Sequence, residues 1–221
     1  MPAARRRPSV VAIWGASGHA QVVADILRLL GRYRIAGFID DVTPGRRGET
    51  FCGARVLGGR EQLDVLLRQG VRRLVLAFGD CGRRLALAEL VRRRGFTLVT
   101  AVHPRAVVAG DVELGEGTVV AAGAVVNPAV RIGRVAIINT SASVDHGCLV
   151  ADGAHIAPGA HLAARVSVGR GAWVGLGAAI KEGVSIGAGA CIGAGAVVLK
   201  DVAPGMLAYG VPARAVKPVA R

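Results

Sequence analysis

Three groups of residues in this chain have types and spacing that could bind a ligand or do chemistry. Gly15-Ala16-Ser17-Gly18-His19 lies between a short apolar run and a stretch with helical spacing. A glycine turn there lets backbone N–H groups and the positive end of a helix approach a phosphate. Asp40 and Asp41 close the next apolar segment, where an acidic side chain can reach a ribose hydroxyl or a base edge. His146 lies two positions after Val144, an apolar residue of a regular repeat. We therefore expect its side chain to point outward and to accept protons near neutral pH.

The glycine motif does not carry the full dinucleotide fingerprint. Gln21 and Val22 stand where the last glycine of that fingerprint could fall, which argues against NAD. A tight turn in a parallel sheet would use the same residue types, so the motif alone leaves both a binding and a structural role open.

Residues 9–100 alternate between apolar runs and helically spaced segments. This alternation predicts a doubly wound, Rossmann-like parallel sheet. The strands are expected at 10–14, 34–39, 74–78 and 96–100, and the helices at 21–30, 59–68 and 83–94.

Residues 101–200 follow a different rule, in which every sixth residue from Val102 to Val198 is aliphatic. A hexapeptide repeat of this length predicts a parallel β-helix with three sides and about 18 residues per coil. We expect the aliphatic side chains to point inward at the corners. The tail, residues 201–221, contains Pro204, Gly205, Gly210 and Pro212 and is predicted to be a loop and terminal arm.

Composition excludes several classes of protein. The net charge is +13, but the basic residues are scattered and aromatic residues make up only 4%, so we do not predict a nucleic-acid-binding protein. A basic surface would still attract polyphosphate ligands. The four cysteines form no CxxC pair or zinc knuckle and are expected to be free thiols, and no metal site is predicted. No apolar run has membrane-spanning length and no signal peptide is expected, so we predict a cytoplasmic protein.

Four motifs occur together in this chain and span nearly its whole length. They are the glycine motif, Phe38-Ile39-Asp40-Asp41, then Asn139-Thr140-Ser141-Ala142-Ser143-Val144-Asp145-His146 within the repeats, and Gly210-Val211-Pro212-Ala213-Arg214 after them. This combination resembles the left-handed β-helix sugar acetyltransferases. That family includes the bacillosamine-pathway UDP-sugar N-acetyltransferase, the perosamine N-acetyltransferases and the sialic acid O-acetyltransferases.

The resemblance implies an acetyl-CoA-dependent N-acetyltransferase that is a homotrimer. The N-terminal domain would hold a nucleotide-linked amino-deoxy sugar, and acetyl-CoA would lie along the coils between subunits. The sugar amine would attack the thioester directly while a histidine removes its proton. Carried onto this chain, the catalytic residues are His146 and Asn139, the acetyl-CoA contacts are His155, Leu176 and Ala194, and the sugar-nucleotide contacts are Ser17, Gly18, His19, Asp40, Asp41 and Gly79.

One position departs from the family pattern. The family usually places Asp or Glu directly after the catalytic histidine, where it raises the basicity of that histidine, but this chain has Gly147. Asp145 precedes the histidine instead. If the two residues alternate as in a strand, their side chains point to opposite sides and Asp145 is not expected to substitute.

Two alternatives to the N-acetyltransferase remain. The acceptor could be a hydroxyl group, as in sialic acid O-acetylation, although a hydroxyl needs a stronger base. The protein could instead be a non-catalytic trimeric scaffold that binds nucleotide sugars. The sequence does not identify the sugar, the nucleobase or the glycan made from the product.

Overall fold

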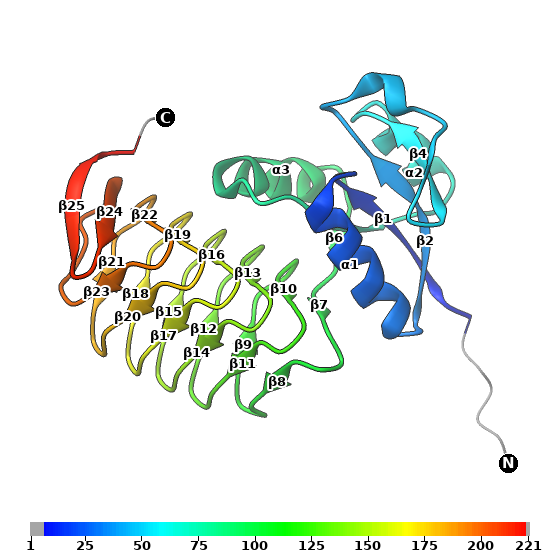
Figure 1. The fold of residues 1–221 in the computed structure, drawn as a ribbon. Helices are drawn as coiled ribbons and strands as arrows, with labels where there is room; N and C mark the ends of the chain where they lie inside the picture. The colour runs from blue at the N-terminus through cyan, green and yellow to red at the C-terminus, as the bar shows by residue number, and fades with distance from the viewer. Residues whose placement is uncertain (1–6, 220–221) are drawn as a thin grey trace, which may run out of the picture.

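The computed structural model describes residues 7–219, which form an N-terminal α/β domain followed by a triangular coil of short strands (Figure 1). The sheet of the first domain has the strand order β3-β4-β2-β1-β5-β6. Its strands are β1 (Ser9–Trp14), β2 (Tyr33–Ile39), β3 (Thr50–Phe51), β4 (Ala54–Gly58), β5 (Arg73–Leu76) and β6 (Thr97–Leu98). All neighbours are parallel except β3, which pairs antiparallel with β4.

Helices cover both faces of this sheet, as the alternating pattern predicts. One face of β1 packs on α1 (Gly18–Leu29), and the other packs on α2 (Gln62–Arg68) and α3 (Cys81–Arg93). A short 3₁₀ helix, η1 (Pro44–Arg46), follows β2. The β3–β4 hairpin was not predicted, because two- and five-residue strands are too short to show a clear period.

The coil has three faces, each formed by one parallel sheet. The first face contains β7 (Ala101–Val102), β10 (Val119–Val120), β13 (Ile137–Ile138), β16 (His155–Ile156), β19 (Trp173–Val174) and β22 (Cys191–Ile192). The second contains β8 (Val107–Val108), β11 (Val125–Val126), β14 (Ser143–Val144), β17 (His161–Leu162), β20 (Ala179–Ile180) and β23 (Val197–Val198). The third contains β9 (Glu113–Leu114), β12 (Arg131–Ile132), β15 (Leu149–Val150), β18 (Ser167–Val168) and β21 (Ser185–Ile186).

Strand pairing gives the predicted 18-residue coil. Val119 lies beside Ile137, and Ile137 lies beside His155. The repeated aliphatic and small residues together form one continuous core. The aliphatic residues are the second residue of each strand, on the flat sides. The corners are turns that end at small residues such as Ala142 and Ala160, so the expectation that the aliphatic residues mark the corners was wrong.

The tail is not the predicted loop. Strands β24 (Met206–Gly210) and β25 (Ala213–Pro218) form an antiparallel hairpin, and β24 extends the first face beside β22. Pro212 lies in the turn of this hairpin, where its missing N–H costs no ladder hydrogen bond. The breaker residues therefore mark a turn between strands.

Candidate active site

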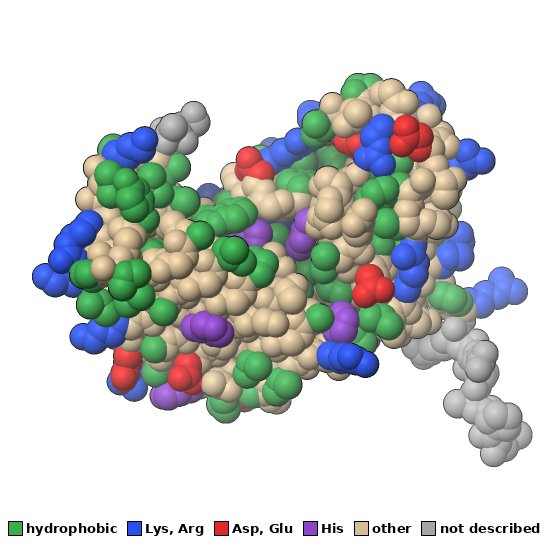
Figure 2. All heavy atoms as spheres, in the orientation of Figure 1, with side chains coloured by type: hydrophobic (Ala, Val, Ile, Leu, Met, Phe, Trp, Pro, Cys, Tyr) green, Lys and Arg blue, Asp and Glu red, His purple; other side chains and the backbone are tan. Residues whose placement is uncertain are grey.

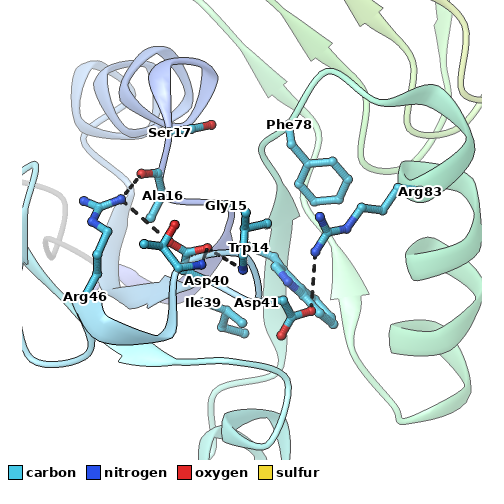
Figure 3. Close-up of a pocket in the computed structure, with 12 residues that line it drawn as sticks. Trp14, Gly15, Ala16, Ser17, Ile39, Asp40, Asp41, Arg46, Phe78 and Arg83 are labelled. Carbon is cyan, nitrogen blue, oxygen red and sulfur yellow. Dashed lines mark hydrogen bonds and ion pairs between the residues drawn. The ribbon is translucent and has the colours of Figure 1, made fainter.

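The N-terminal domain has a pocket of about 220 Å³ at the carboxyl ends of β1, β2 and β5 (Figure 3). This edge is where parallel α/β sheets bind ligands. The predicted residues Ser17, Asp40 and Asp41 line the pocket. It also contains residues that sequence reasoning missed, namely Trp14, Arg46, Phe78 and Arg83.

The two glycines of the first turn have different reasons to be glycine. Gly15 has φ +124°, and a Cβ there would lie 2.5 Å from the carbonyl oxygen of Ala77, so the fold itself requires glycine. A Cβ at Gly18 would meet nothing within 4 Å. Ser17 is the N-cap of α1 but makes no side-chain cap hydrogen bond. Backbone N–H groups at the start of α1 therefore remain available beside the pocket.

Asp40 organises the loop that forms one wall. Its Oδ1 accepts hydrogen bonds from the backbone N–H groups of Val42 (2.9 Å) and Thr43 (3.2 Å). Its Oδ2 lies 3.7 Å from the Arg46 guanidinium, which also donates to the carbonyl of Ala16 (Figure 3). Asp40 is 7% exposed, so its carboxylate mainly holds the loop against the glycine turn.

Asp41 connects three segments at the opposite wall. Its Oδ1 accepts from the backbone N–H of Arg60 at 2.7 Å, and its Oδ2 lies 3.6 Å from Arg83 in the first turn of α3. The Arg83 guanidinium also lies over the ring of Phe78, 5.4 Å from the ring centroid. Figure 3 shows Arg83 reaching across the pocket toward Asp41. A cation placed there suits a ligand that carries phosphate groups.

A second cluster lies where the N-terminal domain meets the first face of the coil. The ring of His155 is 4.1 Å from that of Trp173 and 6.4 Å from that of His19, measured between centroids. A Cβ added at Gly79 would lie 3.6 Å from Trp173 and 3.8 Å from His155. Figure 2 shows histidine side chains at this junction among hydrophobic and uncharged atoms. The fold therefore brings together the predicted His19, Gly79 and His155.

Both junction histidines are neutral. Burial, reinforced by the positive charge of Arg84, lowers the pKa of His155 to about 3 and that of His19 to about 4. The contact with Asn139 gives a second, geometric reason for a neutral His155. The Asn139 Oδ1 accepts from the backbone N–H of Thr140, so its Nδ2 is the donor that faces His155 Nε2 at 3.1 Å. His155 Nε2 is then an acceptor, and the proton lies on Nδ1.

Arg84 joins the two domains. Its guanidinium is 1% exposed and donates to backbone carbonyls of Gly79 (2.7 Å), Val135 (2.7 Å) and Gly153 (2.8 Å). Further contacts reach Phe78 and Ala154. This side chain ties the loop after β5 to two stacked coil turns, the ones that lead into β13 and β16 of the first face.

His146 lies on a different part of the coil. It follows β14, at the corner between the second and third faces, and its side chain is 57% exposed. His146 Nδ1 is 3.0 Å from Asp145 Oδ1. The expectation that these side chains diverge was wrong, because β14 ends at Val144 and both residues belong to the turn, where strand alternation does not apply.

Leu176 and Ala194 lie at the corner between the first and second faces. The backbone N–H of Gly195 donates to the carbonyl of Leu176 at 2.7 Å, which stacks successive turns in one column. Leu176 is 58% exposed and Ala194 is also exposed. The column therefore presents small residues and an apolar side chain to solvent.

Comparison with known proteins identifies the family. Residues 10–91 match the model of the PglD N-terminal domain. PerB from Caulobacter crescentus, solved with CoA and GDP-perosamine, is 42% identical over 95% of this chain and 98% of its own, with a TM-score of 0.90. The acetyltransferase domain of PglB from Neisseria gonorrhoeae is 36% identical over 94% and 99%, with a TM-score of 0.88. WeeI from Acinetobacter baumannii is 28% identical over 94% and 100%, with a TM-score of 0.84.

The chain belongs to the hexapeptide-repeat nucleotide-sugar acetyltransferases. Its coil is the left-handed β-helix of that family, and its N-terminal domain is the Rossmann-like unit. The family, the fold class and the enzyme class predicted from the sequence are thus confirmed.

The predicted site residues of this acetyltransferase fall into separate groups. Ser17, Asp40 and Asp41 line the pocket, with Gly18 beside them, and His19, Gly79, His155 and Asn139 meet at the junction. Leu176 and Ala194 lie at one coil corner, and His146 at another. One chain does not bring His146 to the pocket.

Two features are absent from residues 7–219. No group of His, Cys, Asp and Glu side chains in that range could hold a metal ion. No helix in the same range is long and apolar enough to span a membrane. Among the missed residues, Arg83 and Arg84 had a weak sequence signal, since they begin a predicted helix after a strand. Neither their contacts nor their different burial could be inferred from the sequence.

Proposed function

We propose that this acetyltransferase transfers the acetyl group of acetyl-CoA to an amino group of a nucleotide-linked amino-deoxy sugar. The observation that carries this proposal is the 42% identity, over 95% of the chain, with a protein solved with CoA and GDP-perosamine. The pocket supports it, because α1 and Arg83 offer backbone donors and a cation for a diphosphate. The four cysteines are free thiols, which fits a reaction in the cytoplasm.

His146 is the general base of the proposed reaction. Its Nδ1 faces Asp145, so its Nε2 can take the proton from the attacking amine. The amine nitrogen forms a bond to the acetyl carbon as its proton passes to His146. The carbon–sulfur bond then breaks, and the thiolate of CoA takes up a proton. No acyl-enzyme forms.

His155 has a different role in this proposal. Its pKa of about 3 makes it a poor base at neutral pH. The Nδ1–H of its neutral imidazole can instead donate to the thioester carbonyl and stabilise the oxyanion as it forms, while Nε2 accepts from Asn139. The two histidines would thus divide proton transfer and electrostatic stabilisation between them.

The three faces of the coil support a homotrimer. The N-terminal domain covers much of the first face, where Val119, Ile137 and His155 are buried. The third face carries the charged residues Glu113 and Arg131. The outward residues of the second face are uncharged, namely Val107, Val125, Ser143, His161, Ala179 and Val197. Copies of the coil would bury an uncharged face of this kind against each other.

A threefold axis beside the second face would also assemble the site. The corner between the first and second faces of one copy would then meet the corner between the second and third faces of the next copy. His146 and Asn139 belong to the same coil, at two of its corners. A rotation about an axis parallel to the coil therefore places His146 of a second copy level with Asn139 and close to His155. Leu176 and Ala194 continue that corner as a surface for the pantetheine arm of CoA.

The test is a thiol-release assay with acetyl-CoA and a panel of UDP-, GDP- and dTDP-linked 3-amino and 4-amino sugars. We expect release with one amine, lost in His146→Ala while the oligomer and CoA binding are retained. Wild-type activity in His146→Ala would overturn the mechanism. Release only with hydroxy sugars would favour O-acetylation, and ligand binding without any release would favour a scaffold.

A further inference from the structure

The turn that carries His146 contains a hydrogen-bonded group of polar side chains from two stacked coils. Asp145 Oδ1 accepts from the His146 backbone N–H at 2.7 Å and lies 3.0 Å from His146 Nδ1. The same oxygen accepts from Asn127 Nδ2 at 2.8 Å. Asn127 stands 18 residues before Asp145, one coil away, and its backbone N–H donates to the carbonyl of Val144.

These contacts hold the carboxylate in one place. The backbone N–H of His146, the amide of Asn127 and the His146 ring together keep the pKa of Asp145 below its usual range. Asp145 is therefore ionised at neutral pH, and its only chemical role toward Nδ1 is that of an acceptor. An acceptor at Nδ1 places the proton of neutral His146 on Nδ1 and leaves the Nε2 lone pair free.

The position after His146 cannot supply this contact, because Gly147 has no side chain. Gly147 has φ +67° and takes a left-handed turn. Arg165, the stacked residue one coil on, has φ 57° and a side chain, so the turn itself tolerates a residue with a Cβ. A Cβ at Gly147 would lie 3.4 Å from Arg165 Cγ, a flexible neighbour.

We propose that Asp145, oriented by Asn127, is the positioning residue that fixes the Nδ1–H tautomer of His146 and stabilises its protonated form. This inference rests on the proposed role of His146 as general base. The acidic side chain thus comes from the residue before the histidine. The other charged groups near His146 are Arg165, whose backbone N–H donates to the His146 carbonyl, and Glu182, which pairs with the Arg165 guanidinium.

The first experiment measures the tautomer and does not require turnover. The full-length protein is labelled with ¹⁵N-histidine, and the His146 signals are assigned by their loss in His146→Gln. We expect the Nδ1–H tautomer in the wild type and a shift toward Nε2–H in Asp145→Ala, which leaves Nδ1 without its acceptor. An unchanged tautomer in Asp145→Ala overturns the proposal, even if the protein proves to have no acetyltransferase activity.

The second experiment measures thiol release at saturating substrates across pH. General-base catalysis typically contributes 10²–10⁴-fold, so losing the orienting carboxylate in Asp145→Asn should lower kcat by about 30-fold. The KM values should stay within about twofold, and the acid limb of the pH–rate profile should move to lower pH, because the imidazolium loses its partner. A loss confined to KM, or an unmoved acid limb, contradicts the proposal.

Matched variants separate positioning from folding. Asp111→Asn removes a carboxylate from the same corner two coils earlier, where it accepts from the backbone N–H of Ala129, and should leave kcat unchanged. Asp145→Asn combined with Gly147→Asp restores an acid next to His146 and should recover at least a third of the lost kcat, since aspartate tolerates a left-handed turn. Failure of this rescue in a folded double variant, together with an unchanged tautomer, would assign Asp145 a structural role only.

Discussion

The junction around His155 and the coil corner around His146 place the same side chain in opposite surroundings. His155 is 4% exposed, lies near the Arg84 cation and faces an amide donor at Nε2. His146 is exposed and faces a carboxylate at Nδ1. The buried junction excludes the imidazolium of His155, whereas the coil corner offers the His146 ring a carboxylate partner. Of the two histidines, His146 is therefore the one placed to exchange a proton.

The largest expected effect contrasts the two histidines directly. His146→Gln should lower kcat by about 10³-fold, because it removes the group that accepts the proton. His155→Gln should raise the KM for acetyl-CoA about 10-fold with a smaller loss in kcat, since it removes a polar contact. Steady-state thiol release with both substrates varied measures each. The reverse pattern would exchange the roles of the two regions.

The next effect concerns the stability of the junction. Arg84→Met should lower the free energy of unfolding by about 3 kcal/mol, because it leaves several buried carbonyls without donors. Arg83→Met is the matched control on the neighbouring residue of α3, whose side chain is 38% exposed, and should change stability by less than about 1 kcal/mol. Urea unfolding of both variants measures the difference. Equal effects would show that Arg84 does not join the domains.

The depressed pKa values predict how stability depends on pH. His155 and His19 titrate near pH 3 and 4 in the folded protein but near 6.5 when unfolded. Below pH 6.5 the unfolded state therefore binds more protons, and stability falls as the pH drops. Urea unfolding between pH 6.5 and 5, where most carboxylates stay ionised, should show this loss. His155→Gln should reduce it, and a flat profile in the wild type would contradict the assignment of neutral histidines.

A smaller effect is expected from a substitution that makes the surroundings of His155 resemble those of His146. Asn139→Asp places a carboxylate opposite His155 Nε2, which would favour the protonated ring of His155. The difference in unfolding free energy between pH 6.5 and 5 should become smaller than in the wild type. Asn139→Ala, which adds no charge, is the control. If both variants behave alike, the amide does not help to hold His155 neutral.

Much of the fold could be predicted because the sequence patterns that encode it are periodic or local. The six-residue aliphatic period predicted the coil, since one residue per strand must face a continuous core. The alternation of strands and helices predicted the N-terminal sheet. The β24–β25 hairpin was missed, because Gly210 and Pro212 signal a turn but do not tell whether the flanking segments pair.

The site was predicted in its residues but not in its contacts. Asp41 and Ser17 were named from motifs, whereas Arg83 and Phe78, which complete the pocket, carry no motif of their own. Asp145 was expected to point away from His146, because a strand period was extended one residue beyond the strand. Boundaries of two-residue strands depend on hydrogen bonds to other coils, which a single segment does not encode.

Residue order alone is enough to identify the class of fold, the family and the residues able to do chemistry, because repeats and motifs are local patterns. Which histidine is neutral and which faces a carboxylate becomes clear only in the folded chain. Proton affinity depends on burial, nearby charge and hydrogen-bond partners, and those come from residues far apart in the chain. Arg84 reaches the carbonyl of Ala154, next to His155, across 70 residues of sequence, and Asn127 reaches Asp145 across one full coil.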